Sequence, residues 1–178
     1  MLKHAYCVSC NTGSEAVLKN SLLRLMPQAT VLYPVFDREE RKNGQWQVKT
    51  YPLLPGYLFI YMDTPIDTAL LYSEKRVVRL LGYREDKGTM HSLIGKDLEF
   101  AEWLYDHRGH IKLSRAMLVG DKTKIIDGPL LNYEGEIIKI NRQRRSALVR
   151  MQVGDLIKDV WLYFHWMTLK DGELVDWR

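Results

Sequence analysis

The sequence lacks any apolar run that approaches the roughly 20 residues needed to cross a bilayer. Its first residues, Met1 to Tyr6, also lack the basic segment and long apolar stretch that a signal peptide requires. We therefore expect a cytoplasmic protein with no membrane partner.

Cysteine is scarce, with two residues in the whole chain. Cys7 and Cys10 have the spacing of half a zinc site or of a redox pair. No second cysteine pair follows, and residues three apart on a strand point to opposite faces. A redox pair would also place its first cysteine at a helix N-terminus. We therefore expect no metal site.

The sequence also lacks the residue patterns that are typical of catalytic sites. The five histidines show no spacing that pairs them with a nucleophile, and no glycine-rich loop could cradle a phosphate. We therefore expect a protein that is not an enzyme and uses no cofactor.

The overall composition is that of a globular protein, with 46% hydrophobic and 27% charged residues. A length of 178 residues allows one domain or two small ones. The net charge of +4 favours an acidic partner only mildly, so the positions of the charges must decide.

A proline and glycine corner, Pro52 to Gly56, leads into an apolar strand, Tyr57 to Ile60. Proline biases its neighbours toward extended geometry, and glycine permits backbone conformations that other residues resist. Tyr57 and Phe59 share one face of that strand, because they are two residues apart. One face can thus meet a core and the other a partner.

Strands and helices alternate in the first half of the chain. The expected order is a strand at Tyr6 to Cys10, a helix that ends before Pro27, a strand at Ala29 to Phe36, a hairpin around Asn43-Gly44, a strand at Tyr57 to Met62, a short helix, a strand at Val77 to Leu81, a polar loop at residues 83–91, and a third helix. Such a series predicts an α/β sandwich with helices on an antiparallel or mixed sheet, which we place at residues 1–107.

Polar residues mark the expected starts of the three helices. Thr12 with Glu15 forms the pattern of a capping box, Thr64 precedes a proline, and Ser92 can cap the third helix. In that third helix, Ile94 and its periodic partners predict the buried face, whereas Asp97 is expected toward solvent.

The second half of the chain has short strands and turn signals. Residues 108–116 show no sustained periodicity, and we expect them to be a linker. In Ser146 to Val153 apolar residues recur at every second position, and Gly154-Asp155 is typical of a two-residue hairpin turn. Residues 117–178 are therefore predicted to form a small closed β-barrel.

Two motifs identify a family. The segment from Gly120 to Pro129, followed by Tyr133 to Ile137, resembles the KOW module, an SH3-like barrel built around a glycine. Preceded by Pro52 to Phe59 and by Val77 to Gly82, it resembles the NusG family of transcription elongation factors. The resemblance implies an α+β protein: an NGN-like domain followed by a KOW barrel.

The resemblance also implies a docking surface for RNA polymerase. In this family the N-terminal domain binds the clamp helices of the polymerase through an apolar patch, which maps here to Leu54, Tyr57, Phe59 and Leu81. The residues alone favour the core over an interface for each of these four, because a strand must bury one face. The resemblance assigns Tyr57 to the interface. Ser9 departs from the family, since some members carry an aromatic residue there.

Basic residues gather in the second half. No acidic residue lies between Lys139 and Arg150. On a solvent-exposed surface that binds no partner, acidic residues are normally interspersed with basic ones. Guanidinium groups pair well with phosphate oxygens. A solvated hairpin is the alternative to an RNA-binding surface. The expected RNA-binding residues are Lys122, Lys124, Lys139, Arg142, Arg144 and Arg145.

These features together favour a specialised antitermination factor, most similar to the LoaP type, that acts as a monomer. Its expected partners are the clamp region of RNA polymerase and a leader RNA hairpin, with nontemplate DNA as an alternative. A housekeeping NusG-like factor that couples polymerase to the ribosome or to a termination factor remains a second interpretation. A ribosome or RNA-maturation protein with a KOW barrel is a third.

Overall fold

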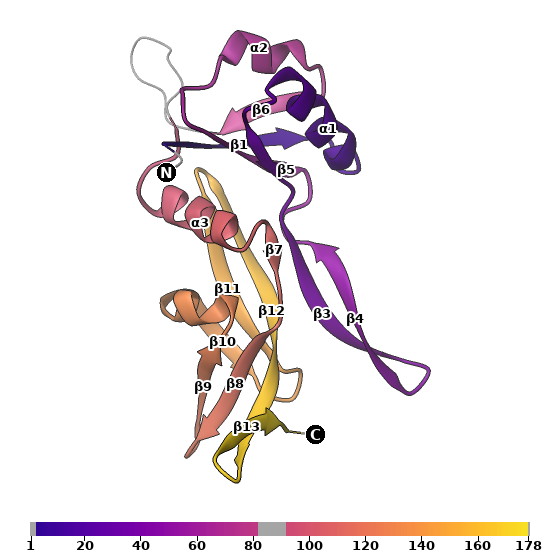
Figure 1. Ribbon diagram of the computed structural model, residues 1–178, viewed down its shortest axis with the longest axis vertical. Coiled ribbons are helices and arrows are strands. Elements are labelled where there is room, and N and C mark those ends of the chain that lie inside the picture. Colours follow the sequence, from indigo (N-terminus) through magenta and orange to yellow (C-terminus); the bar gives the residue numbers. More distant parts are fainter. Residues whose placement is uncertain (1–2, 82–91, 178) are drawn as a thin grey trace. The chain divides into compact units, whose positions relative to one another are not determined.

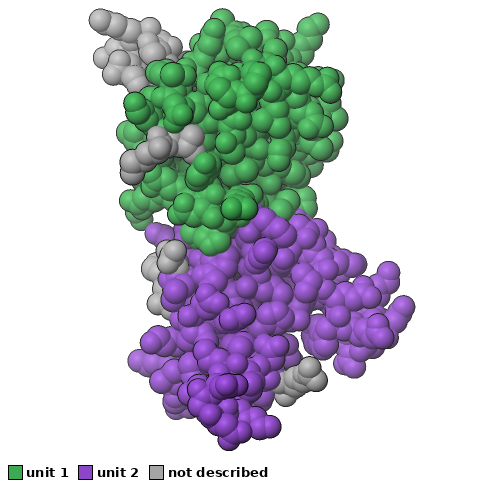
Figure 2. Space-filling model, in the orientation of Figure 1, with its two compact units in different colours: residues 1–35, 52–109, 152–157 green, residues 36–51, 110–151, 158–178 purple. Residues whose placement is uncertain are grey.

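The computed structural model describes residues 3–81 and 92–177, so the polar loop expected at residues 83–91 lies outside the described residues. The chain forms two compact units, shown in Figure 2. Unit 1 contains Met1–Val35, Pro52–Gly109 and Gln152–Ile157, and unit 2 contains Phe36–Tyr51, His110–Met151 and Lys158–Arg178.

Unit 1 is built on a four-stranded antiparallel sheet (Figure 1). Its strands, in spatial order, are β2 (Thr30–Leu32), β5 (Tyr57–Met62), β1 (His4–Cys10) and β6 (Val77–Leu81). Its helices are α1 (Glu15–Leu25), α2 (Thr68–Ser73) and α3 (Gly95–Asp106). Helices on an antiparallel sheet confirm the expected α+β class.

Helices pack on both faces of this sheet. On one face, Leu58 and Ile60 pack in a cluster with Leu18 and Leu22 of α1 and with Leu71 of α2. The other face meets α3. There the Phe59 and Phe100 rings contact edge to face at 5.7 Å, and the Tyr61 hydroxyl donates to the Ala101 carbonyl at 2.7 Å. The sheet is thus the middle layer of unit 1.

The start of α1 is tied to the proline and glycine corner by the carboxylate of Glu15, which is almost fully buried. One oxygen accepts from the Gly13 N–H at 2.7 Å, and the other accepts from the Gly56 N–H at 2.8 Å. The Gly56 carbonyl in turn accepts from the Cys10 N–H at 2.8 Å. The corner is therefore fixed to the first turn of α1 and to the end of β1.

Gly56 has a φ of +84°, and a β-carbon there would lie 3.0 Å from the Cys10 carbonyl oxygen. Both facts require glycine, since other residues resist this conformation and the backbone leaves no room.

The expected helix starts are wrong in detail. Ser14 is the N-cap of α1, and Glu15 is the first helical residue, not the third, so Thr12 and Glu15 do not form a capping box. Asp67, not Thr64, caps α2 and accepts from the N–H groups of Ala69 and Leu70. Ile94 is the N-cap residue of α3. Asp67 is the better cap because its carboxylate reaches two free N–H groups.

Two further expectations are corrected. The strand expected at Ala29 to Phe36 is divided into β2 and β3 around Pro34, because proline cannot donate to a ladder. In α3, Ile94 is exposed, whereas Asp97 is buried together with Phe100 and Leu104. The helix is therefore rotated relative to the predicted face.

Unit 2 is rich in strands. A three-stranded sheet has the order β4 (Gln45–Pro52), β3 (Val35–Lys42) and β7 (His110–Ile111). Asn43 and Gly44 join β3 to β4 with positive φ values, as the predicted hairpin turn requires.

The larger sheet of unit 2 follows from residue 114 onward. Its main path has the order β10 (Ile137–Asn141), β11 (Ser146–Val153), β12 (Leu156–Lys170), β8 (Ser114–Val119) and β9 (Lys122–Asp127), and β13 (Glu173–Asp176) pairs with β12. A 3₁₀ helix, η1 (Pro129–Glu136), separates β9 from β10. Strands β7 and β8 begin within residues 108–116, and the domain boundaries at 107 and 117 stay a prediction.

Gly128, the glycine of the KOW-like motif, is required for steric reasons. Gly128 has a φ of +90°, and a β-carbon there would lie 2.7 Å from the Ser114 α-carbon. The Ser114 hydroxyl also accepts from the Leu130 N–H at 2.9 Å. The start of β8 thus packs directly against the turn after β9, and only glycine fits between them.

We predict that Glu15→Gln lowers the free energy of unfolding by about 1–3 kcal/mol, because the amide leaves one buried N–H without an acceptor. Urea denaturation measures the change. Glu102→Gln, an exposed change on α3, is the matched control and should have little effect.

The stabilisation by Glu15 should depend on pH. Burial alone would raise the pKa of Glu15, but hydrogen bonds from the N–H groups of Glu15, Gly56 and Gly13 and from Tyr33 outweigh it and hold the pKa below its usual value. A lowered pKa stabilises the fold at neutral pH, and this stabilisation is lost as the pH falls through the folded-state value. The difference between wild type and Glu15→Gln should therefore shrink in acid; a constant difference would contradict the role of the charge.

We predict that Gly128→Ala destabilises the protein by more than the roughly 1–3 kcal/mol expected from a positive φ alone, because Ser114 must also move. Gly172→Ala is the matched control, since Gly172 has a φ of +84° with open space around it. Thermal unfolding measures both. If both variants lose the same amount of stability, the close approach of Gly128 to Ser114 does not contribute to the cost of the substitution.

Candidate functional sites

Tyr57 lies in a row that crosses three strands of unit 1. Ser9 of β1 pairs with Tyr57 of β5 on one side and with Arg79 of β6 on the other. Directly paired residues of antiparallel strands share a face, so the three side chains lie on the α3 face of the sheet. All three are at least partly exposed. We call Tyr57, Ser9 and Arg79 the Tyr57 row.

The other expected polymerase-binding residues are inside unit 1. Leu54, Phe59 and Leu81 are 1%, 0% and 3% exposed. Phe59 packs on Phe100, and Leu81 pairs with Cys7 beside Phe59. These three side chains support the surface on which Tyr57 stands, and Tyr57 alone of the predicted four reaches solvent.

The turn between β11 and β12 belongs to unit 1 and borders this face. The Arg79 guanidinium forms a two-pronged ion pair with Asp155, with N–O distances of 3.1–3.2 Å. The Gly154 N–H donates to the buried carboxylate of Asp97 at 2.6 Å. The Tyr57 row is therefore bounded by a polar edge at Arg79.

The expected RNA-binding residues differ in the partners that their side chains have. The Arg142 guanidinium donates to Thr123 at 3.2 Å and to the Asp121 carbonyl, so it ties two turns together. Arg145 pairs with Glu39 at 3.6 Å. Among the residues that the structure describes, no acidic side chain pairs with Lys122, Lys124, Lys139 or Arg144, and all four are exposed.

The basic residues divide between two hollows of unit 2. Lys122 and Lys124 line an open groove of about 450 Å³ together with apolar side chains of β9 and β10. Arg144 and Arg145 line a second hollow of about 570 Å³. Lys139 lines neither of these two hollows. Arg142 lines neither hollow but donates to Thr123 in the groove, so the predicted residues are spread over both hollows.

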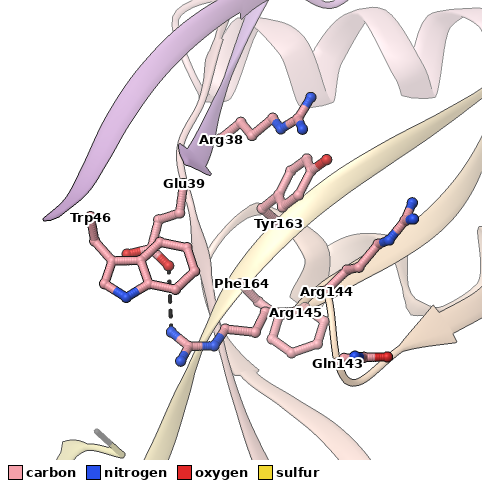
Figure 3. Close-up of a pocket in the computed structure, with 8 residues that line it drawn as sticks. All are labelled: Arg38, Glu39, Trp46, Gln143, Arg144, Arg145, Tyr163 and Phe164. Atoms are coloured by element: carbon pink, nitrogen blue, oxygen red, sulfur yellow. Dashed lines mark ion pairs between the residues drawn. The ribbon is translucent and has the colours of Figure 1, made fainter. Parts of the chain in front are cut away.

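The second hollow contains residues that sequence patterns did not single out. We call it the Trp46 cleft, and Figure 3 shows its lining: Arg38, Glu39, Trp46, Gln143, Arg144, Arg145, Tyr163 and Phe164. Trp46 is 57% exposed although it is a large aromatic residue. Its isolated position in a charged hairpin was a usable signal, since tryptophan is rarely left in solvent without a reason.

The two cysteines are buried in the sheet of unit 1, with free thiols. Burial, and to a lesser extent Asp97, raises the pKa of Cys7, which favours an inert thiol. Within residues 3–81 and 92–177 no group of histidine, cysteine and acidic side chains could hold a metal ion. No helix in the described part of the chain is long and apolar enough to cross a membrane.

Comparison with solved structures supports the fold. A structure described as "Domain interaction in Thermotoga maritima NusG" matches with a TM-score of 0.52 and 20% identity, and the match covers 90% of this chain and 93% of that one. At this identity the likeness concerns the fold alone.

Comparison with known sequences supports the family. The chain is 24% identical to the transcription termination/antitermination protein NusG of Treponema pallidum, over 86% of this chain and 91% of the relative. It is 25% identical to the protein of the same name from Pseudomonas aeruginosa, over 88% and 90% of the two chains. The family model described as "Transcription termination factor nusG" matches residues 3–96. Because this match covers more than half of the chain, the protein belongs to the NusG family of transcription termination and antitermination factors.

Proposed function

We propose that the protein is a specialised antitermination factor, which binds RNA polymerase through unit 1 and a leader RNA hairpin through unit 2. It acts without a cofactor and without catalysis, by holding polymerase in a processive state. Membership of the NusG family supports the general role, and the surfaces of the two units support the specific one.

The Tyr57 row is the observation that carries the polymerase proposal. It places an aromatic ring, a small hydroxyl and a guanidinium side by side on a rigid sheet. Aromatic residues and arginine are the types that dominate binding energy at protein interfaces. Ser9 leaves room between the two larger side chains, so a side chain from a polymerase helix can enter there.

Leu54, Phe59 and Leu81 contribute to docking indirectly. Each is buried, so its truncation would open a cavity of the kind that costs about 2–5 kcal/mol of stability. A docking test at these positions would therefore measure folding first. Tyr57 is the residue at which docking and folding can be separated.

The RNA proposal rests on the basic side chains that have no acidic partner. Arg144, Lys139, Lys122 and Lys124 are exposed on unit 2, and free cations attract phosphate without first breaking an ion pair. Phosphate contacts of this kind position a duplex, whereas unpaired bases supply sequence information. A leader hairpin offers phosphates in its duplex stem and unpaired bases in its loop.

This proposal distinguishes the protein from a housekeeping family member. A housekeeping factor would alter elongation equally on every template. A specialised factor should act only on templates whose leader carries its RNA element.

We predict that Tyr57→Ala weakens binding to RNA polymerase by about 10-fold, because an interface aromatic is lost. Binding is measured by biolayer interferometry with purified core polymerase, and terminator readthrough is measured in a defined transcription reaction. Val17→Ala, an exposed apolar change on α1 at the opposite face, is the control and should leave both values unchanged. An unaffected Tyr57→Ala protein with native stability would exclude the Tyr57 row as the docking surface.

We predict that Arg144→Ala lowers the slope of log affinity against log salt by about 1 for binding to a leader hairpin, because one phosphate contact is lost. Arg150→Ala is the matched control, since it removes the same charge from a guanidinium that Asp159 already neutralises at 2.9 Å. Fluorescence anisotropy measures both slopes. Equal slopes for the two variants would contradict the distinction between free and paired arginines.

A further inference from the structure

We propose that the Trp46 cleft binds an unpaired guanine nucleotide, with the base stacked on Trp46 and its Watson–Crick edge on Glu39. This inference rests on the proposed binding of nucleic acid by unit 2. It extends that function from phosphate contacts to the recognition of one base.

The cleft has the size and composition of a small-molecule site. Its volume of about 570 Å³ falls within the range of roughly 300–1,000 Å³ that is usual for ligand pockets. Three segments of unit 2 line it: the β3–β4 hairpin, the β10–β11 turn and β12 (Figure 3). Polar groups converge on an aromatic wall, which is the arrangement that orients a planar ligand.

Trp46 and Arg145 form a stacking platform. The Arg145 guanidinium lies over the indole at 5.3 Å from the ring centroid. Exposed aromatic faces accept any base, and guanidinium planes also stack on bases. A base that enters the cleft can therefore lie against the indole, the guanidinium or both.

The backbone holds Arg145 in an unusual conformation. Its φ is +51°, which is uncommon for a residue other than glycine. Its carbonyl accepts from the Phe164 N–H at 2.9 Å, and its own N–H donates to the Arg142 carbonyl at 3.3 Å. Strain of this kind persists where the surroundings fix it and often marks a binding site.

Glu39 selects the base. Its two carboxylate oxygens lie 3.6 Å from an Arg145 nitrogen and 3.5 Å from His165 Nδ1. Both distances exceed the roughly 2.7–3.2 Å of a good hydrogen bond, so both oxygens can still accept. Guanine has two adjacent donors on its Watson–Crick edge, N1–H and the N2 amino group, and these match a carboxylate. Uracil, cytosine and adenine each place an acceptor beside the donor, and a carboxylate repels that acceptor.

Arg144 completes the site. Its guanidinium has no acidic partner among the described residues, and it lines the same cleft. The phosphate of the bound nucleotide can therefore pair with Arg144 while the base contacts Trp46 and Glu39. An unpaired guanine is available in the loop of an RNA hairpin and in single-stranded DNA.

The test uses the full-length protein and labelled hairpins that share one stem and differ at a single loop position. The loop is uridine except for its central base, which is G, A, C or U, and a DNA series repeats the design. Fluorescence anisotropy measures affinity. We expect the G loop to bind about 10-fold more tightly than the others, as one stacked and hydrogen-bonded base allows.

Variants separate the two contacts. Trp46→Ala should lower the affinity for the G-loop hairpin about 10-fold, to that of the U-loop hairpin, whereas Trp46→Phe should retain most of the preference for G. Glu39→Gln should bind all loops nearly alike without loss of U-loop affinity, since it replaces one of the two acceptors for guanine and also removes a negative charge beside Arg145. Val48→Ala, an equally exposed change two residues along β4, is the control and should behave as wild type.

The outcomes distinguish this inference from the proposed function. If all hairpins bind tightly without base preference, guanine recognition by the Trp46 cleft is excluded and RNA binding by unit 2 stands. The same conclusion follows if the preference for G survives both Trp46→Ala and Glu39→Gln. A guanine preference limited to the DNA series would support the cleft and contradict the RNA partner. Failure to bind any hairpin would overturn both.

Discussion

The Glu15 carboxylate is a buried charge that joins the first turn of α1 to the corner before β5. It accepts from Gly13 at the start of α1 and from Gly56 at the proline and glycine corner. Because the Gly56 carbonyl also accepts from the Cys10 N–H, both polar groups of Gly56 are engaged. A polar group buried without such a partner would cost more than the hydrogen bond contributes. The carboxylate thereby sets where β5 begins.

That starting point determines the surface we assign to polymerase. With Gly56 fixed beside Cys10, Tyr57 pairs with Ser9, and Ser9 pairs with Arg79 on the far side. Phe59 then falls under α3, where its ring contacts Phe100. On the α3 face of the sheet, this register places the exposed Tyr57 row next to the buried row that contains Phe59. The proposed docking surface therefore lies next to the corner that Glu15 ties to α1.

Sequence patterns predicted the layers of unit 1 well, because apolar periodicity and glycine or proline signals act locally. The class, the β3–β4 hairpin and the corner before Tyr57 followed from such signals. The helix starts did not, because several polar residues compete for each cap and only geometry selects Ser14 or Asp67. Asp97 was misplaced for a similar reason: its partner, the Gly154 N–H, is distant in the sequence.

The candidate sites show the same limit. The run from Lys139 to Arg150 contains no acid, yet Glu39 and Asp159 neutralise Arg145 and Arg150 from other segments. Local charge counting therefore overestimated the free charge. Arg142 and Arg144 are both exposed in that turn, but Arg142 donates to Thr123 and to the Asp121 carbonyl. Trp46 itself could have been singled out in the sequence, but the cleft around it could not, since it joins a hairpin, a turn and a strand that are far apart in the chain.

We assign the Tyr57 row to the contact with RNA polymerase. Photo-crosslinking tests it most directly, with a benzophenone amino acid placed at Tyr57 in the full-length protein and a reconstituted elongation complex as target. We expect a crosslink to a polymerase subunit from position 57 and none from position 17 on the opposite face. Crosslinking from position 17 but not from position 57 would contradict it.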